Sequence, residues 1–138
     1  TKFKMEIKNN SECCIYIFTP DLSNQSIVLF PYKPIHSSYC GITGYRLFPR
    51  KESIQADEVG NKEVMAIVIS KQELDYKAVN EAINKSTQTN FSAKVNEALS
   101  ASSDKNVNYS AGANGTIQFK ASAAGNSIVT SVVEIDKQ

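Results

Sequence analysis

The sequence predicts an α+β domain with a mainly antiparallel, sandwich-like β body, and the order of its hydrophobic patterns carries this prediction. Several strand patterns separated by loops lie within residues 3–69, a helical period follows over residues 70–99, and strand patterns return from residue 107. Such segregation favours α+β over a doubly wound fold, in which strands and helices alternate. The 138 residues suit one domain, so we expect residues 1–138 to form a single unit.

Five strands are expected before the helices. Phe3–Ile7 alternates apolar with charged residues, which is typical of a strand with one wet face. Cys13–Phe18 is apolar on both faces and is therefore expected at the centre of a sheet. Successive side chains of a strand point to opposite faces, so Cys13 and Cys14 should lie on opposite sides of this strand. The other three expected strands are Ser26–Phe30, Tyr45–Phe48 and Glu63–Ile69.

The tripeptide Leu-Phe-Pro ends two of these strands, at residues 29–31 and 47–49. Proline removes a donor from the hydrogen-bond ladder, so both strands should stop there. We predict that they end near the same rim of the sheet and that residues 32–45 form the loop between them. A loop of this length exceeds the usual hairpin connection and is typical of functional or self-packed segments.

Two helices and a C-terminal β-meander complete the prediction. Ser70 and Glu73 have capping-box spacing, which predicts a helix that begins at Ser70 or within two residues of it. A second helix should hold Phe91–Leu99. Strands are then expected at residues 107–111, 116–121 and 127–135, with Asn114-Gly115 as a hairpin signal between the first two.

Composition limits the classes of partner and the covalent framework. The net charge is +1, with a mild basic excess in residues 1–51, so no basic patch points to nucleic acid. No apolar run reaches the roughly 18 residues of a membrane helix, so we expect no membrane insertion by this segment. Because the chain opens with Thr1 and enters a strand at once, we expect a piece of a longer protein. Cys40 could bridge to Cys13 or to Cys14, or all three cysteines could remain thiols.

Catalytic and metal-binding patterns are weak. His36 and Cys40 lie four residues apart on one loop, without the signature or layout of a cysteine hydrolase. Adjacent cysteines on a strand point apart, so Cys13 and Cys14 cannot readily bind one zinc ion. The Asp57-Glu58 pair is interpreted as a solvated turn. We therefore predict no catalytic, cofactor-binding or metal-binding residues and no cofactor.

Aromatic residues are the remaining signal. They gather around residues 30–48, together with Arg46 and Arg50. Tyr and Arg are enriched at recognition surfaces because they combine apolar area with a polar tip. We therefore predict partner contacts at Tyr32, Tyr45, Arg46 and Arg50, with the alternative that most of these rings belong to the core.

Five segments of the N-terminal part also resemble a known family. They are residues 14–18, 28–32, 41–49, 57–60 and 66–71, of which Gly41–Pro49, with its Leu-Phe-Pro, is the most specific. Residues 3–84 resemble the bacterial family DUF4384, whose name denotes a domain of unknown function. Residues 85–138, which hold the second helix and the meander, do not match it. The resemblance implies a non-catalytic accessory module, often placed C-terminal to caspase-like peptidase domains, within an envelope-associated or extracytoplasmic parent protein.

Three functions follow as hypotheses. The first is an accessory interaction module that binds a protein or peptide partner, or a companion domain of the same chain. The second is a purely structural domain that docks against a caspase-like peptidase or an envelope complex. The third is a cryptic cysteine hydrolase built on Cys40 and His36.

Overall fold

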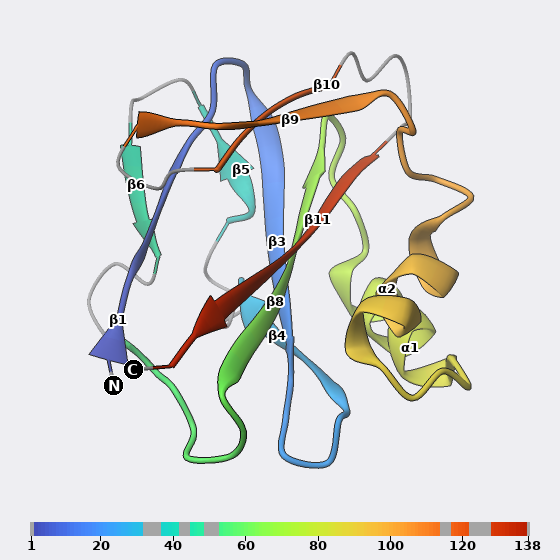
Figure 1. The fold of residues 1–138 in the computed structure, drawn as a ribbon. Helices are drawn as coiled ribbons and strands as arrows, with labels where there is room; N and C mark the ends of the chain where they lie inside the picture. Colours follow the sequence, from blue (N-terminus) through green and yellow to red (C-terminus); the bar gives the residue numbers. More distant parts are fainter. Residues whose placement is uncertain are drawn as a thin grey trace.

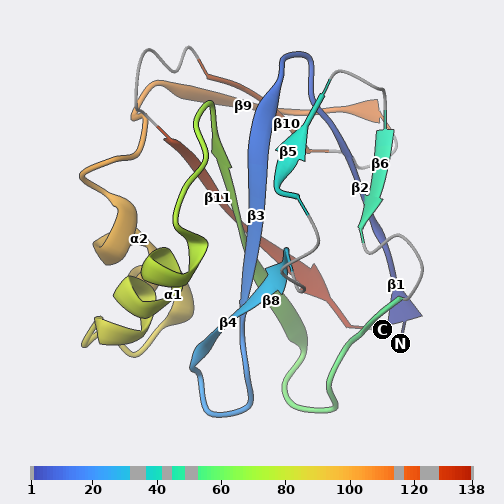
Figure 2. The ribbon, with the colours of Figure 1, turned by 180° about the vertical axis from the view of Figure 1, so that it is seen from behind.

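The chain folds into three layers, and the central sheet is the middle one (Figure 1). The computed structural model describes residues 2–31, 37–41, 45–48, 53–113, 117–121 and 128–137, with the backbone alone for 45–48 and 121. Within these residues it contains two helices and mostly antiparallel strands, which confirms the predicted α+β class. The helices cover one face of the central sheet, and short strand pairs cover the other (Figure 2).

The central sheet is built around β3 (Cys13–Pro20). Its order is β11-β8-β3-β4, where β8 is Lys62–Ser70, β11 is Ile128–Asp136 and β4 is Ser26–Phe30. β8 occupies one edge of β3. The opposite edge is shared by β4, which pairs with the end of β3, and by β5 (Tyr39–Cys40), which pairs with its start. All of these pairings are antiparallel.

Burial on both faces of β3 confirms its predicted central position. Cys14, Tyr16 and Phe18 belong to the cluster beneath the helices. Cys13, Ile15 and Ile17 belong to the cluster on the opposite face. Cys13 and Cys14 thus point to opposite sides and are both buried, as the sequence predicted.

Short strand pairs form the layer opposite the helices. β1 (Lys2–Phe3) pairs with β7 (Ile54–Gln55), and β2 (Met5–Lys8) pairs with β6 (Tyr45–Phe48). Every second residue of β1 and β2 is partly buried, and these side chains (Phe3, Met5 and Ile7) pack against the cluster that contains Ile15. The predicted alternation of the N-terminal strand is therefore present, and it gives this layer one dry face.

The two Leu-Phe-Pro segments end strands of different sheets. β4 ends at Phe30, before a cis peptide bond to Pro31, whereas β6 ends at Phe48 and pairs with β2. The prediction of a shared rim on one sheet is therefore wrong, because the chain crosses from the central sheet to the outer layer between these strands. The connecting segment also contains β5, which pairs with β3.

The C-terminal strands are divided between two sheets rather than forming one meander. β9 (Val107–Ala111) and β10 (Ile117–Ala121) pair as an antiparallel ribbon, as the Asn-Gly signal predicted. β11 instead pairs along its whole length with β8. It alternates apolar residues on both faces and so can extend both core clusters, which the polar ribbon strands cannot do.

The first helix begins later than the capping-box spacing predicted. α1 spans Tyr76–Lys85, and its N-cap is Asp75, whose carboxylate accepts a 3.1 Å hydrogen bond from the amide of Ala78. Ser70 still belongs to β8, and its hydroxyl accepts from the amide of Gln72. The prediction of a helix start at Ser70 is wrong because the serine satisfies a turn at the end of the strand. α2 (Phe91–Leu99) matches the prediction.

Helix α1 also protects the edge of the central sheet. The side-chain amide of Asn84 accepts from the amide of Ser26 at 2.6 Å and donates to its carbonyl at 3.0 Å. Ser26 begins β4, the edge strand, so these bonds satisfy backbone groups that the edge would leave open. The same contact fixes the position of α1 over the sheet.

We expect Asp75→Ala to lower the free energy of unfolding by about 1 kcal/mol, because it removes the acceptor for the first turn of α1. Glu73→Ala is the matched control, since Glu73 is exposed and lies outside the helix. It should change stability by less than about 0.5 kcal/mol. Urea denaturation of both variants measures the difference. A larger loss of stability for Glu73→Ala would support the predicted Ser70–Glu73 capping box instead.

Candidate functional site

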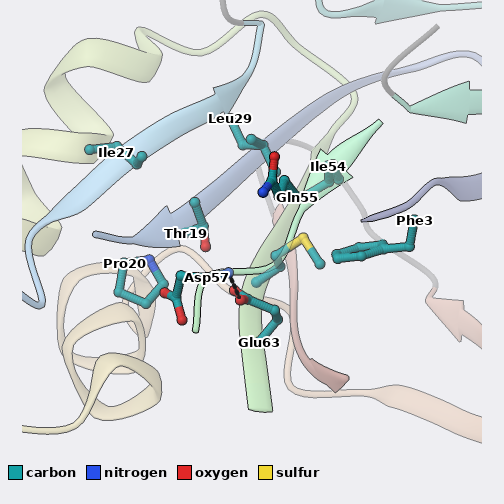
Figure 3. A pocket seen from close by; sticks show the side chains of 10 residues that line it. Phe3, Thr19, Pro20, Ile27, Leu29, Ile54, Gln55, Asp57 and Glu63 are labelled. Carbon is teal, nitrogen blue, oxygen red and sulfur yellow. Dashed lines mark hydrogen bonds between the residues drawn. The ribbon is translucent and has the colours of Figure 1, made fainter. Parts of the chain in front are cut away.

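A pocket of about 190 Å³ opens where the central sheet and the outer layer separate. Its walls come from β3, β4 and β8 on one side and from β1 and β7 on the other (Figure 3). Apolar side chains form most of the surface, and four polar residues complete it. The lining residues are Phe3, Thr19, Pro20, Ile27, Leu29, Ile54, Gln55, Asp57, Glu63 and Met65.

The strand periodicity explains why these side chains meet. Ile27 and Leu29 are two residues apart on β4, so both point to the face that carries the pocket. Thr19 lies opposite Ile27 in the β3–β4 register. Its hydroxyl donates a 2.9 Å hydrogen bond to the carbonyl of Val64 in β8, which holds the neighbouring strands together at the pocket.

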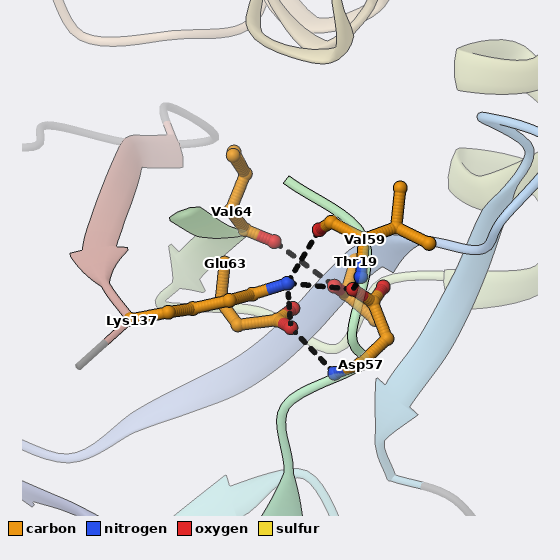
Figure 4. Close-up of polar contacts among 6 residues, drawn as sticks. All are labelled: Thr19, Asp57, Val59, Glu63, Val64 and Lys137. Carbon is orange, nitrogen blue, oxygen red and sulfur yellow. Dashed lines mark hydrogen bonds and ion pairs between the residues drawn. The ribbon is translucent and has the colours of Figure 1, made fainter. Parts of the chain in front are cut away.

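A lysine and two carboxylates form the polar rim (Figure 4). The ammonium group of Lys137 lies 2.6 Å from Asp57 Oδ1, 3.1 Å from Glu63 Oε1 and 2.6 Å from the carbonyl of Val59. The carboxylate of Glu63 also accepts from the amide of Asp57 at 2.9 Å. The side chains of Lys137 and Glu63 are only 13% and 16% exposed. This arrangement ties the residue after β11 to the loop between β7 and β8.

The loop itself is shaped for this contact. Asp57 Oδ1 accepts from the amide of Val59 at 2.8 Å, an Asx turn that brings the Val59 carbonyl to Lys137. Gly60 follows with φ of 71°, a conformation that favours glycine. A second backbone bond runs from the amide of Lys137 to the carbonyl of Asn61 at 2.8 Å.

Lys137 and Asp57, the ion pair of the rim, shift each other's pKa. The hydrogen bond from Lys137 is the main reason that the pKa of Asp57 lies below its usual range, and the Val59 amide lowers it further. The hydrogen bond to Asp57 likewise raises the pKa of Lys137, against a smaller opposing effect of burial. Both groups therefore remain charged at neutral pH, and the ammonium group of Lys137 stays paired with carboxylates beside the apolar pocket.

Exposed apolar side chains surround the same end of the molecule. Leu22, Ile27 and Val59 are 75%, 45% and 65% exposed. Leu22 lies in the β3–β4 turn and Val59 in the β7–β8 loop, and both segments lie at the lower end of the view in Figure 1. Of these three residues, Ile27 lines the pocket itself, and the segments that carry the other two lie at the same end of the molecule.

For the four residues predicted to contact a partner, the structure describes no side chain. Tyr32 and Arg50 lie outside the described residues. Tyr45 and Arg46 lie in β6, where the backbone alone is described. Their predicted role therefore stays a prediction. Tyr39, in the same segment, is half exposed.

The positions of the cysteines bear on the cysteine-hydrolase and metal-site hypotheses. Cys40 is fully buried, which leaves its sulfur no access to a substrate, and His36 lies outside the described residues. Cys13 and Cys14 belong to opposite faces of β3. Within the described part of the chain, no group of three or more His, Cys, Asp or Glu side chains is placed to hold a metal ion.

Sequence reasoning missed the Lys137 contact. The Asp-x-Val-Gly pattern predicts a solvated turn at Asp57, and the turn is present. The partner lysine, however, is 80 residues away in sequence. Its only local signal is its position directly after a long apolar strand, and that signal does not identify a carboxylate.

No protein-family model, curated protein or solved structure matches this chain. The resemblance to DUF4384 therefore stays a prediction. Among the described residues, neither helix has the length and apolar character that crossing a membrane requires.

We expect Lys137→Met to lower stability at neutral pH, because it leaves Asp57 and Glu63 without their ammonium partner while the apolar stem is kept. The advantage of the wild type should be complete above a pH of roughly 4, the pKa of Asp in an unfolded chain. It should disappear as the pH falls through the lower folded-state pKa of Asp57. Urea midpoints of both proteins across this range measure it.

Lys62→Met serves as the matched control for this series. Lys62 pairs with Glu134 at 2.8 Å, but both side chains are about half exposed, at 52% and 53%. Exposed pairs contribute little, so this variant should match the wild type closely. If Lys137→Met showed a midpoint difference that stayed constant down to acid pH, the lost hydrogen bond to the Val59 carbonyl rather than the carboxylate charges would explain it.

Proposed function

We propose that this chain is a non-catalytic accessory module that binds a protein or peptide segment, from a partner or from a companion domain of a larger bacterial protein. The observation that carries the proposal is the pocket between the layers, with its apolar walls and acidic rim. Exposed apolar side chains around the same end support a macromolecular partner.

The size of the pocket favours a single side chain over a free small molecule. Ligand sites for drug-sized molecules and cofactors measure roughly 300–1,000 Å³. The pocket here is about 190 Å³ and is lined mostly by aliphatic and aromatic groups. One apolar side chain of a partner fits this volume, while the rest of the partner would lie on the surrounding surface.

The rim favours a basic group next to that side chain. Asp57, Glu58 and Glu63 are the acidic residues of the β7–β8 segment, against Lys62 and the incoming Lys137. The carboxylate of Asp57 is still 42% exposed, so it can accept a further cation. We therefore propose an extended segment that carries an apolar residue beside Lys or Arg.

The second candidate is a purely structural docking domain, and one observation favours it. The β9–β10 ribbon exposes Tyr109 and Ile117 on one face, where the rings of Tyr109 and Phe119 form a tilted pair with centroids 5.8 Å apart. The hydroxyl of Tyr109 donates a 3.4 Å hydrogen bond to the carbonyl of Thr130 in β11, which joins the ribbon to the central sheet. A two-stranded ribbon is marginally stable without cover, so a neighbouring domain could pack on the part of this face that stays exposed. The two candidates use different surfaces and can be separated by mutation.

Selection from a random peptide library on the purified chain tests the binding proposal. Enriched peptides should contain an apolar residue next to Lys or Arg. Ile27→Lys removes apolar pocket wall and places there a charge of the same sign as the basic residue of the peptide, so it should weaken binding of those peptides about tenfold or more. Ile117→Lys, a substitution of comparable exposure on the ribbon, should leave their affinity unchanged.

Two outcomes would count against the binding proposal. One is the absence of any enriched motif. The other is equal binding by the wild type and Ile27→Lys. Circular dichroism and thermal denaturation of both variants establish that they fold, so that a loss of binding is assigned to the pocket.

A further inference from the structure

The chain has three cysteines, and the fold places two of them directly opposite each other. Cys13 begins β3, and Cys40 ends β5. In the antiparallel β3–β5 pair they are register partners, and both belong to the core cluster that faces the outer layer. Cys14, next in the chain, faces the helices on the other side of the sheet. All three are present as thiols.

The hydrogen-bond pattern fixes the spacing of this pair. The amide of Ile15 donates to the carbonyl of Ser38 at 2.9 Å, so residues 15 and 38 form a hydrogen-bonded pair. Such pairs alternate with non-hydrogen-bonded pairs, and two residues further along the register Cys13 and Cys40 are again of the hydrogen-bonded kind. Their Cα atoms are then about 5.5 Å apart. Disulfides span Cα separations of roughly 4.4–6.8 Å, so this spacing allows one, but they also need Cβ atoms about 3.5–4.5 Å apart. The Cβ atoms of a hydrogen-bonded pair lie nearer to about 5.5 Å, so the bond requires a local shift of β5 towards β3.

We propose that Cys13 and Cys40 form an intramolecular disulfide under oxidising conditions and that Cys14 stays a thiol. The bond would fasten β5 to the central strand. β5 is two residues long and ends the segment that follows β4, so the bond would hold this connection in place. The proposal concerns a different part of the molecule from the pocket and does not depend on peptide binding.

The chemistry requires a disulfide oxidant, such as glutathione disulfide. The thiolate of one cysteine attacks the oxidant, which forms a mixed disulfide and releases one glutathione thiolate. The thiolate of the second cysteine then attacks the protein sulfur of the mixed disulfide and releases the other glutathione. The two protein sulfurs together lose two electrons, the oxidant gains them, and the two thiol protons pass to solvent or to the released thiolates.

Burial controls the rate of this reaction. Cys13 and Cys40 are 5% and 0% exposed, and the thiol of Cys40 donates to the carbonyl of Ser38 at 3.6 Å. The side-chain amide of Asn9 also donates to the carbonyls of Cys40 and Gly41, at 3.3 and 3.2 Å. An oxidant therefore reaches the pair only when β5 separates locally from β3. Oxidation should be slow in buffer and faster in urea concentrations below the unfolding transition.

The test is to incubate the reduced chain with glutathione disulfide, alkylate the remaining thiols after unfolding, and map the peptides by mass spectrometry. The expected product has one alkylated cysteine, Cys14, and a Cys13–Cys40 linkage. Cys14→Ser should give the same linkage, whereas Cys13→Ser and Cys40→Ser should give none. The fully unfolded chain should give Cys13–Cys40 and Cys14–Cys40 in comparable amounts, which shows that the folded register selects the first.

Stability and hydrogen exchange provide independent readouts. The disulfide should raise the melting temperature by roughly 5–10 °C in Cys14→Ser. It should also slow exchange of the Ile15 amide, which β5 protects. A Cys14–Cys40 linkage in the folded chain would overturn the proposal. So would persistent glutathione adducts without closure, or three alkylated cysteines after prolonged oxidation in sub-denaturing urea.

Discussion

Burial of β3 on both faces is the constraint on which the other elements depend. A strand that is apolar on both sides needs a cover on each face and a neighbour on each edge. The helices and the outer strand pairs supply the covers, β8 supplies one edge, and β4 with β5 supplies the other. Elements from the whole length of the chain thus pair with or pack against β3, whose six buried residues, Cys13–Phe18, lie near the start of the chain.

Tyr16 adds a polar contact to this apolar centre. Its side chain is buried beneath the helices, and its hydroxyl accepts from the amide of Leu74 at 2.7 Å and from the hydroxyl of Ser38 at 3.2 Å. Burial raises its pKa, so the phenol stays neutral and keeps its hydrogen-bonding capacity. One side chain on β3 therefore positions both the approach to α1 and the start of β5, which joins the helical layer to the edge of the sheet.

Local patterns in the sequence were sufficient for most elements and insufficient for their pairing. The bounds of β4 and β6 follow from short apolar segments that end at proline, and the ribbon that contains β9 follows from the Asn-Gly turn signal. All of these signals lie within a few residues of the strands. The pairing of β11 with β8 joins strands that are far apart in the sequence. It depends on which strand of the sheet has an open edge, and no local pattern encodes that. Ser70 illustrates the opposite error: its capping-box spacing predicts a helix start, although the strand continues to Ser70 and its hydroxyl accepts from the amide of Gln72.

The pocket was hidden from the sequence for a related reason. Its walls join Phe3, Leu29, Ile54 and Met65, which are ordinary core residues when each is taken within its own strand. Only the relation between layers makes them line a cavity. The Lys137 contact is likewise a long-range pairing, whereas the Asx turn that prepares it was visible.

The pocket lies where β1 and β7 of the outer layer meet the central sheet. On this side of the sheet, the loop between β7 and β8 is fixed by the contacts of Lys137 with Asp57 and Glu63. The side chain of Asp57 is still 42% exposed, so water reaches this loop. The apolar surface left beside it is the part of this fold that a partner can cover without disturbing the two-sided burial of β3.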